Sequence, residues 1–314
     1  PVLTVSAVSG AGIEALRQAL AGAAEAHAAR AVEGQHFRLA IDRAFTIAGS
    51  GTVVTGTVFN GTIVAGAKLV VSPRGAPVRV RGIQIRGIAA ERARAGQRCA
   101  LNLTGADLES VARGDWLLEE AIHAPTQRVE ARVSVLAAER EALEHWTPVH
   151  VHLATADITA RIAIPRGGAI APGATATAQL VLDKPVGALH GDRFILRDQS
   201  ARRTLGGGVV LDPFARAARR AAAARGAELA ALGRDTPAAA LAAMLESDES
   251  GLDLARFERT FNLKPERAAQ LYAAAGVAML GKETRIGMPR ARHDALREKL
   301  LGSRANCSTS ASWK

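Results

Sequence analysis

The chain is poor in cysteine, in aromatic residues and in long apolar runs. Its two cysteines, Cys99 and Cys307, are far apart in 314 residues and lack metal-ligand spacing, which argues against a disulfide scaffold and suits a reducing cytoplasm. Aromatic residues make up 4% with one tyrosine, so a base-stacking platform for single strands is disfavoured. No stretch reaches the roughly 18–20 apolar residues of a membrane span, and the first residues lack the basic region of a signal peptide. We therefore expect a cytoplasmic protein without a membrane partner.

The sequence also contains no Gly-x4-Gly-Lys-Ser/Thr phosphate loop and no Asn-Lys-x-Asp guanine element. Without a phosphate cradle, phosphoryl transfer has nothing to stabilise its charge. We expect no catalytic residues in this chain and no nucleotide bound by it alone. His150 and His152 share one face of a predicted strand, but no cysteine or carboxylate cluster completes a metal site. They are interpreted as polar residues on a barrel face, and we expect no metal.

The chain carries a formal net charge of +10 and has a pI near 10.6. Such an excess of positive charge favours polyanionic partners, of which RNA is the obvious candidate. Because aromatic residues are sparse, the expected RNA contacts are with phosphate and sugar. The alternative is that the Ala- and Arg-rich composition only reflects a biased genome, and composition does not decide between the two.

Five changes in sequence pattern divide the chain. Residues 1–33 read as a strand, a Gly-rich turn and a helix, which is a piece of an α/β domain and too small to be a domain alone. Residues 34–122 read as short strands with turn signals, and the change of parity at Gly82 predicts a bulge or a sharp strand bend of the kind that small barrels need. Residues 123–213 form a second strand-rich block, which predicts a second antiparallel barrel.

Helical sequence follows the second strand-rich block. The Ala-rich pattern of residues 214–235, which contains several arginines, predicts a helical linker. Residues 236–301 predict three short helices, a hairpin and a last helix, in the order typical of a winged-helix domain, with Thr236 as an N-cap before Pro237. Residues 302–314 are polar and are expected to be disordered.

Residues 37–58 carry a family resemblance. They read Phe-Arg-Leu-Ala-Ile-Asp-Arg-Ala-Phe-Thr-Ile-Ala-Gly-Ser-Gly-Thr-Val-Val-Thr-Gly-Thr-Val, two apolar strands joined by a Gly-Ser-Gly turn. With the later Arg-Ala-Gly-Gln-Arg turn at 94–98 and Gly-Asp-Trp at 114–116, the pattern resembles the second domain of translational GTPases that deliver aminoacyl-tRNA. The Asp42-Arg43 pair and Arg98 are similar to those of the selenocysteine-specific elongation factor.

The resemblance implies a mainly β fold with α-helices. It consists of two consecutive antiparallel β-barrels, preceded by a remnant of an α/β GTPase domain and followed by a helical linker and a winged-helix domain. The intact protein would bind GTP and magnesium, carry selenocysteinyl-tRNA to the ribosome and hydrolyse GTP there. Further C-terminal winged helices, largely missing here, would grip a hairpin in the selenoprotein mRNA. The chain would then be a fragment that begins at the end of the GTPase domain.

The resemblance also implies site residues. Asp42, Arg43 and Arg98 would form a pocket for the selenocysteinyl group, because guanidinium donors suit a selenol that is ionised near neutral pH. Phe45 and Thr55 match positions near the amino acid and the tRNA end. The alternative for the charged residues is a surface salt bridge of little consequence.

Two more groups are candidates. Ser6 and Ala7, in the turn Ser-Ala-Val-Ser-Gly-Ala-Gly, resemble the last guanine-binding element of translational GTPases. Arg197, Arg202 and Arg203 surround a predicted hairpin and are candidates for contact with tRNA phosphates, although a solvated turn explains them equally well. Two other functions stay open: another tRNA-delivering GTPase, such as the γ subunit of an initiation factor, and a non-enzymatic winged-helix regulator that binds nucleic acid.

Overall fold

The computed structural model describes residues 2–28, 34–49, 51–215, 222–248, 250–281 and 284–309, and the chain divides into two compact units, 1–33 and 34–314. In the first unit, a turn leads into α1 (Ile13–Ala28). The predicted helix is thereby confirmed as far as Ala28. The predicted strand at residues 2–6 is wrong: the described residues of this unit provide no neighbouring strand to pair with it.

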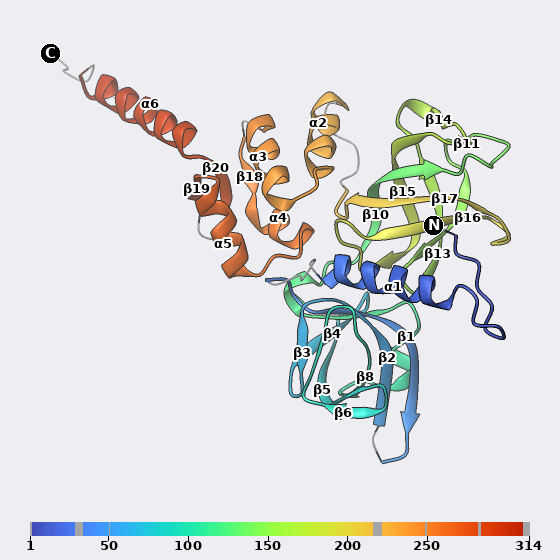
Figure 1. Cartoon of the computed structure of the whole chain (residues 1–314). Helices are drawn as coiled ribbons and strands as arrows, with labels where there is room; N and C mark the ends of the chain where they lie inside the picture. Colours follow the sequence, from blue (N-terminus) through green and yellow to red (C-terminus); the bar gives the residue numbers. More distant parts are fainter. Residues whose placement is uncertain are drawn as a thin grey trace. The chain divides into compact units, whose positions relative to one another are not determined.

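The first barrel follows from Arg38 to Leu118, and Figure 1 shows it in blue and cyan. Six strands close into an antiparallel ring in the order β4-β9-β1-β2-β8-β5, with β4 pairing back onto β5. The closed barrel predicted from the short strands is confirmed. Its strands are β1 (Arg38–Ile47), β2 (Gly51–Asn60), β4 (Lys68–Ser72), β5 (Ala76–Ile85), β8 (Arg98–Thr104) and β9 (Trp116–Leu118).

Three further short strands accompany this barrel, which the sequence pattern did not predict as separate elements. β3 (Thr62–Val64) and β7 (Arg92–Arg94) pair with each other, and β6 (Ile88–Ala90) pairs with β5. The pairing of β5 with β8 shifts register between Val80 and Gly82, which confirms the predicted bulge. As a result Val78, Val80 and Ile83 all face the barrel interior although their spacing changes. A 3₁₀ turn, η1 (Leu108–Ser110), lies between β8 and β9.

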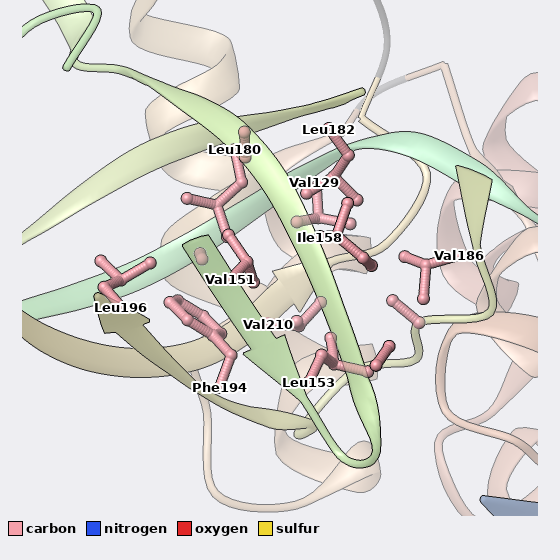
Figure 2. Packing of buried hydrophobic residues seen from close by; sticks show 14 of the residues in the cluster. Val129, Val151, Leu153, Ile158, Leu180, Leu182, Val186, Phe194, Leu196 and Val210 are labelled. Carbon is pink, nitrogen blue, oxygen red and sulfur yellow. The ribbon is translucent and has the colours of Figure 1, made fainter. Parts of the chain in front are cut away.

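The predicted second antiparallel barrel is confirmed. Its six strands close into a ring in the order β10-β15-β13-β12-β16-β17. Alternate residues of β13 are buried, as expected for a barrel strand. Figure 2 shows apolar side chains from these strands meeting in the interior, among them Val129, Val151 and Leu180. The elements of this barrel are η2 (Glu120–Ile122), β10 (Thr126–Val135), β11 (Leu143–Glu144), β12 (Pro148–Leu153), β13 (Ala156–Ala163), η3 (Pro165–Gly167), β14 (Ala169–Ile170), β15 (Thr175–Val186), β16 (Arg193–Asp198) and β17 (Thr204–Asp212).

A buried charge joins the two barrels. Arg38, at the start of β1, is 2% exposed and donates two hydrogen bonds to Asp192 of the loop between β15 and β16, at 3.0 and 2.8 Å. Its guanidinium also lies 3.9 Å from the centroid of the Trp116 ring. Trp116 belongs to the same apolar cluster as the core of the second barrel. The barrels therefore share one interface, in which an ion pair is enclosed by apolar side chains.

The C-terminal domain has its own apolar core, to which Leu241, Phe257 and Tyr272 contribute. Its three short strands form a sheet in the order β18-β20-β19, and the Thr236 hydroxyl caps α3 by accepting a hydrogen bond from the Ala239 amide at 3.2 Å. The predicted N-cap is confirmed. The elements are α2 (Ala222–Leu232), α3 (Pro237–Ser247), β18 (Leu252–Asp253), α4 (Leu254–Thr260), α5 (Pro265–Ala274), β19 (Val277–Leu280), β20 (Ile286–Pro289) and α6 (Arg290–Thr309).

The order of helices and hairpin is the predicted one, and the assignment of a winged helix stays a prediction. Helix α2 confirms the helical character predicted for residues 222–232, but its Leu229 and Leu232 pack into the core of the C-terminal domain, so this stretch is not a free linker. Residues 216–221 lie outside the described part. The expected disorder from residue 302 is wrong as far as Thr309, because α6 continues to that residue. After Gly302 neither glycine nor proline interrupts the helix. The last five residues lie outside the described part. No helix in the described residues is long and apolar enough to span a membrane.

Candidate functional site

The candidate pocket depends on a β-bulge in the first strand of the first barrel. Ile41 pairs with Gly56 and Arg43 with Thr55, which leaves Asp42 as an extra residue in β1. A Cβ atom at Gly56 would lie 2.1 Å from the Ala40 carbonyl oxygen, so only glycine permits this close approach of β1 and β2. A bulge redirects side chains locally. Here it allows Asp42 to reach Thr55 on β2 and, beyond β2, Arg98 on β8.

Arg98 at the start of β8 binds Asp42 with both arms of its guanidinium group. Nε donates to Oδ2 and Nη2 donates to Oδ1, each at 2.9 Å. Nη2 also donates to the Thr55 hydroxyl at 3.2 Å, and that hydroxyl donates to Asp42 Oδ1 at 2.5 Å. The three side chains therefore form a closed hydrogen-bonded triangle, and the bidentate geometry is the strong form of the arginine–carboxylate contact.

Arg43 lies beside this triangle. It is exposed, it pairs with Thr55 across the strands, and its charge acts on Asp42. The hydrogen bond from Arg98 lowers the pKa of the Asp42 carboxyl, and the Thr55 hydroxyl and the charge of Arg43 act in the same direction, against the opposing effect of burial. Asp42 is therefore ionised at neutral pH. Two guanidinium groups facing one carboxylate leave the cluster with a surplus of positive charge, which suits an anionic ligand.

The predicted contact residues have different surroundings. Phe45 lies two residues beyond Arg43 on the same face of β1 and is 36% exposed, so it offers apolar surface next to the charged cluster. The Thr55 hydroxyl forms hydrogen bonds with Asp42 and Arg98. The sequence resemblance placed Thr55 near the tRNA end. It gave no signal that this hydroxyl links the two charged residues.

In the first unit, Ser6 and Ala7 begin a tight turn before α1. The Ser6 amide donates to the Ala11 carbonyl at 3.0 Å, and the Ser6 hydroxyl accepts from the Ser9 amide at 3.2 Å. Ala7 is exposed. The turn is closed by its own hydrogen bonds, and its exposed part is at Ala7.

The candidate phosphate contacts lie on the second barrel, in the hairpin between β16 and β17. Arg197 is partly buried and donates to the Arg202 carbonyl at 3.3 Å, while Arg203 lies 3.5 Å from the Glu139 carboxylate. Asp198 accepts from the amides of Arg202 and Arg203 and holds the turn. The Arg197 side chain and the backbone amides of Arg202 and Arg203 therefore help to hold the hairpin itself. It does not bring them together with Asp42.

The two histidines are on the outer face of the same barrel. His150 Nδ1 lies 2.8 Å from an Asp157 carboxylate oxygen, and the His152 ring stacks at 6.3 Å from that of His150. Within the described residues, no group of three or more histidine, cysteine or acidic side chains is arranged to hold a metal ion.

Both barrels match models of known protein families. Residues 51–118 match the model of elongation factor Tu domain 2, and residues 126–217 match that of the selenocysteine-specific elongation factor β-barrel domain. Both matching models describe domains of translation elongation factors. The resemblance predicted from the sequence, to the selenocysteine-specific elongation factor, is confirmed, and neither alternative function is favoured.

Relatives support the same resemblance. Over 220 residues the chain is 35% identical to the selenocysteine-specific elongation factor of Desulfomicrobium baculatum, covering 70% of this chain and 34% of that protein. Over 219 residues it is 37% identical to that of Escherichia coli strain K12, covering 68% and 33%. The chain thus spans about a third of the length of the curated relatives it matches.

Solved structures agree on the fold. The crystal structure of the bacterial selenocysteine-specific elongation factor EF-Sec superimposes with a TM-score of 0.69 at 24% identity, covering 95% of this chain and 47% of that one. Translation elongation factor SelB from Methanococcus maripaludis, in its apo form, gives a TM-score of 0.55 at 23% identity, covering 66% and 49%.

Proposed function

We propose that this chain supplies the tRNA-binding barrels of a selenocysteine-specific elongation factor, and that Asp42, Arg43 and Arg98 bind the selenocysteinyl group of its tRNA. The observation that carries the proposal is the bidentate contact between Arg98 and Asp42, with Arg43 beside it. Asp42 fixes the Arg98 guanidinium in one orientation, and the exposed Arg43 adds the charge that a selenolate requires. Phe45 next to Arg43 shields one side of the ligand from water.

Selectivity would follow from charge. A selenol is ionised near neutral pH, whereas the hydroxyl of a seryl group is neutral. Guanidinium donors therefore favour the selenolate over the hydroxyl. Phosphate contacts elsewhere on the barrels, for which exposed Arg202 is a candidate, would set general tRNA affinity without distinguishing the two aminoacyl groups.

The test compares selenocysteinyl-tRNA and seryl-tRNA on the same tRNA body. We expect Arg43→Ala or Arg98→Ala to weaken binding of selenocysteinyl-tRNA roughly tenfold to a hundredfold, because a charge-assisted contact contributes about 1.5–3 kcal/mol. Binding of seryl-tRNA should change little. Arg92→Ala, which removes an exposed arginine from β7 of the same barrel, is the matched control and should leave the ratio of the two affinities unchanged. Equal losses for both tRNAs would show that the two arginines contact only the tRNA body.

GTP and magnesium belong to the proposed function of the longer factor. The residues of this chain do not fit the nucleotide, because the phosphate loop is absent from the sequence and the Ser6 amide already bonds to Ala11. No step of hydrolysis is therefore assigned to this chain. Only the exposed Ala7 end of that turn is available to a guanine.

We expect titration of the chain with GTP and magnesium in a calorimeter to give no heat of binding. The physical reason is the missing phosphate cradle. Micromolar affinity would contradict the assignment of residues 1–33 to the end of a GTPase domain.

Delivery to the ribosome and a cytoplasmic location follow from the same proposal, and the longer factor would contact a selenoprotein mRNA hairpin through further C-terminal winged helices largely missing here. We further propose that residues 236–301 are a winged helix that acts mainly as a spacer. Helix α5 carries Arg267 but few other side chains that read bases, and Arg267 Nη1 is already 3.3 Å from the Gln270 side chain of the same helix.

A further inference from the structure

A short segment, residues 34–37, leads into the first barrel and lies against the turn between α4 and α5 of the C-terminal domain. The two segments are far apart in the sequence: the hydrogen bonds between His36 and Asn262 join residues 226 positions apart. Gln35 forms an isolated antiparallel bridge with Leu263, and the Lys264 amide donates to the Gly34 carbonyl at 2.8 Å. We name residues 261–264 the clamp turn.

Asn262 makes the central contact of the clamp turn. Its side-chain oxygen accepts from the His36 amide and its side-chain nitrogen donates to the His36 carbonyl, each at 3.0 Å. Asn262 is 3% exposed and has a φ of +55°, a conformation that asparagine tolerates better than most residues. One side chain therefore binds both backbone groups of a residue in another part of the molecule.

Gly34 allows the segment to approach α5 closely. Its φ is +79°, and a Cβ atom there would lie 2.9 Å from the Cβ of Arg267. A Cβ at Gly61 of the first barrel would likewise lie 2.7 Å from the Phe37 backbone. Residues 34–37 therefore contact both the first barrel and the C-terminal domain.

Glu119, just after β9 of the first barrel, connects the same two parts. Its carboxylate accepts from the Phe37 amide at 2.9 Å, contacts His36 Nδ1 at 2.7 Å and lies 3.7 Å from Lys264 Nζ. Burial acts to raise the pKa of Glu119, but hydrogen bonds from His36 and the Phe37 amide outweigh it and the pKa is lowered. The carboxylate is therefore charged while it bridges the segment and the start of α5.

The second barrel meets the clamp turn from its loop between β15 and β16. The His190 amide donates to the Thr260 carbonyl at 3.1 Å, and the His190 ring lies 4.4 Å from that of Phe261. Two residues later in this loop, Asp192 binds Arg38, which follows directly after residues 34–37. The two barrels and the C-terminal domain therefore all meet where the chain enters β1.

We propose that the clamp turn is a reversible latch, through which the C-terminal domain controls the order of residues 34–37. These residues adjoin the boundary at Glu33 and Gly34, so any mechanical coupling between the two units along the chain passes through them. The clamp turn is joined to residues 34–37 by hydrogen bonds, with an ion pair between Glu119 and Lys264 beside them, and these contacts can open without unfolding either barrel. When the C-terminal domain shifts or loosens, the entry segment loses its order. When the domain is fixed, the segment is held.

Hydrogen–deuterium exchange on the 314-residue chain tests the latch. Asn262→Gly retains a residue suited to the left-handed turn and removes both side-chain bonds to His36. We expect exchange in a peptide covering residues 34–38 to accelerate about tenfold or more, since each lost hydrogen bond contributes about 1 kcal/mol. Exchange in strands β12 and β13 of the second barrel should not change. Ala201→Gly is the matched control, because it also places glycine at a positive φ but in the hairpin between β16 and β17.

A second variant acts from a distance. Leu241→Ala opens a cavity in the buried core of the C-terminal domain, away from the hydrogen bonds of the clamp. If the domain controls the segment, exchange at residues 34–38 should accelerate along with exchange in α3. Unchanged protection of residues 34–38 in both variants, while α3 exchanges faster in Leu241→Ala, would overturn the proposal. So would an equal acceleration in Ala201→Gly.

Discussion

A single hydroxyl group, that of Thr55, forms hydrogen bonds with both Asp42 and Arg98 of the candidate pocket. It donates to Asp42 and accepts from Arg98, so it completes the triangle that orients the guanidinium. The hydrogen bond from Thr55 is one of the contacts that lower the pKa of Asp42. Thr55 is therefore expected to act on a ligand through Asp42 and Arg98, as a positioning residue.

Thr55→Val tests this role, because valine has nearly the same shape but no hydroxyl. We expect the pKa of Asp42, followed by NMR of its carboxyl carbon, to rise toward its usual value. A carboxyl with a lowered folded pKa stabilises the fold above its unfolded pKa, and this stabilisation is lost as the pH falls through the folded value. As the pH is lowered, Thr55→Val should therefore lose the stabilisation from ionised Asp42 at a higher pH than the unmodified chain.

Thr55→Ser is the matched control and should restore the low pKa of Asp42. If Thr55→Val left that pKa unchanged, the hydroxyl would have no part in orienting the pair. Affinity for selenocysteinyl-tRNA should fall several-fold in Thr55→Val and recover in Thr55→Ser, since a net hydrogen bond contributes about 1 kcal/mol.

At the scale of elements, helix α3 depends on its first residues. Pro237 occupies the first helical turn, where its missing N–H is no loss, and the Thr236 hydroxyl accepts from the Ala239 amide. The buried side of this helix carries Leu241 and Leu245 into the core of the C-terminal domain. The cap therefore contributes to the stability of that domain.

We expect Thr236→Ala to destabilise α3 by about 1 kcal/mol, which is typical for the loss of an N-cap. Native-state hydrogen exchange of amides in 238–247 measures this, and they should exchange roughly fivefold faster. Thr236→Ser keeps the acceptor and should change little. An equal effect of serine and alanine would show that the methyl group of Thr236, rather than its oxygen, stabilises the helix.

At the scale of the whole molecule, the ion pair between Arg38 and Asp192 fixes one barrel to the other. Both side chains are largely buried, at 2% and 10% exposure, so neither can be left alone without a large desolvation cost. Trp116 covers the guanidinium with its ring. We infer that the two barrels unfold together.

A double-mutant cycle with Arg38→Met and Asp192→Asn measures this coupling. Each single change should lower the free energy of unfolding in urea by about 3–5 kcal/mol, because it leaves one charge buried without its partner. The double variant should be more stable than the sum of the two losses predicts, since no uncompensated charge remains. Additive losses would mean that the pair does not couple the barrels.

Much of the fold could be predicted because the local sequence pattern of most segments favours the same secondary structure that they adopt in the folded protein. Alternating apolar residues with Gly-containing turns define strands whatever their neighbours are, and the change of parity at Gly82 marked a bulge. The segment 2–6 shows the opposite case. Its side chains favour a strand, but a strand also requires a partner, and the described residues of its unit provide none.

The candidate site was partly predictable for the same reason. The motif containing Asp42, Arg43 and Arg98 could be recognised in sequence, and the structure joins Asp42 to Arg98. No local pattern showed that Thr55 would bridge them, because the bridge requires the bulge in β1 that lets Asp42 reach across β2 to Arg98 on β8. The ion pair of Arg38 was also missed, since a charged residue next to Phe37 and Leu39 gives no indication of a partner 154 residues away.

The sequence by itself therefore determined the two barrels, the helices of the C-terminal domain and the family resemblance, because these depend on periodicity and on contiguous motifs. Tertiary structure alone decided which side chains meet: Thr55 with Asp42 and Arg98, Arg38 with Asp192, and Asn262 with His36. Each of these contacts joins residues on different strands or in different domains. Their distance depends on how the barrels close and pack, which no local stretch of sequence specifies.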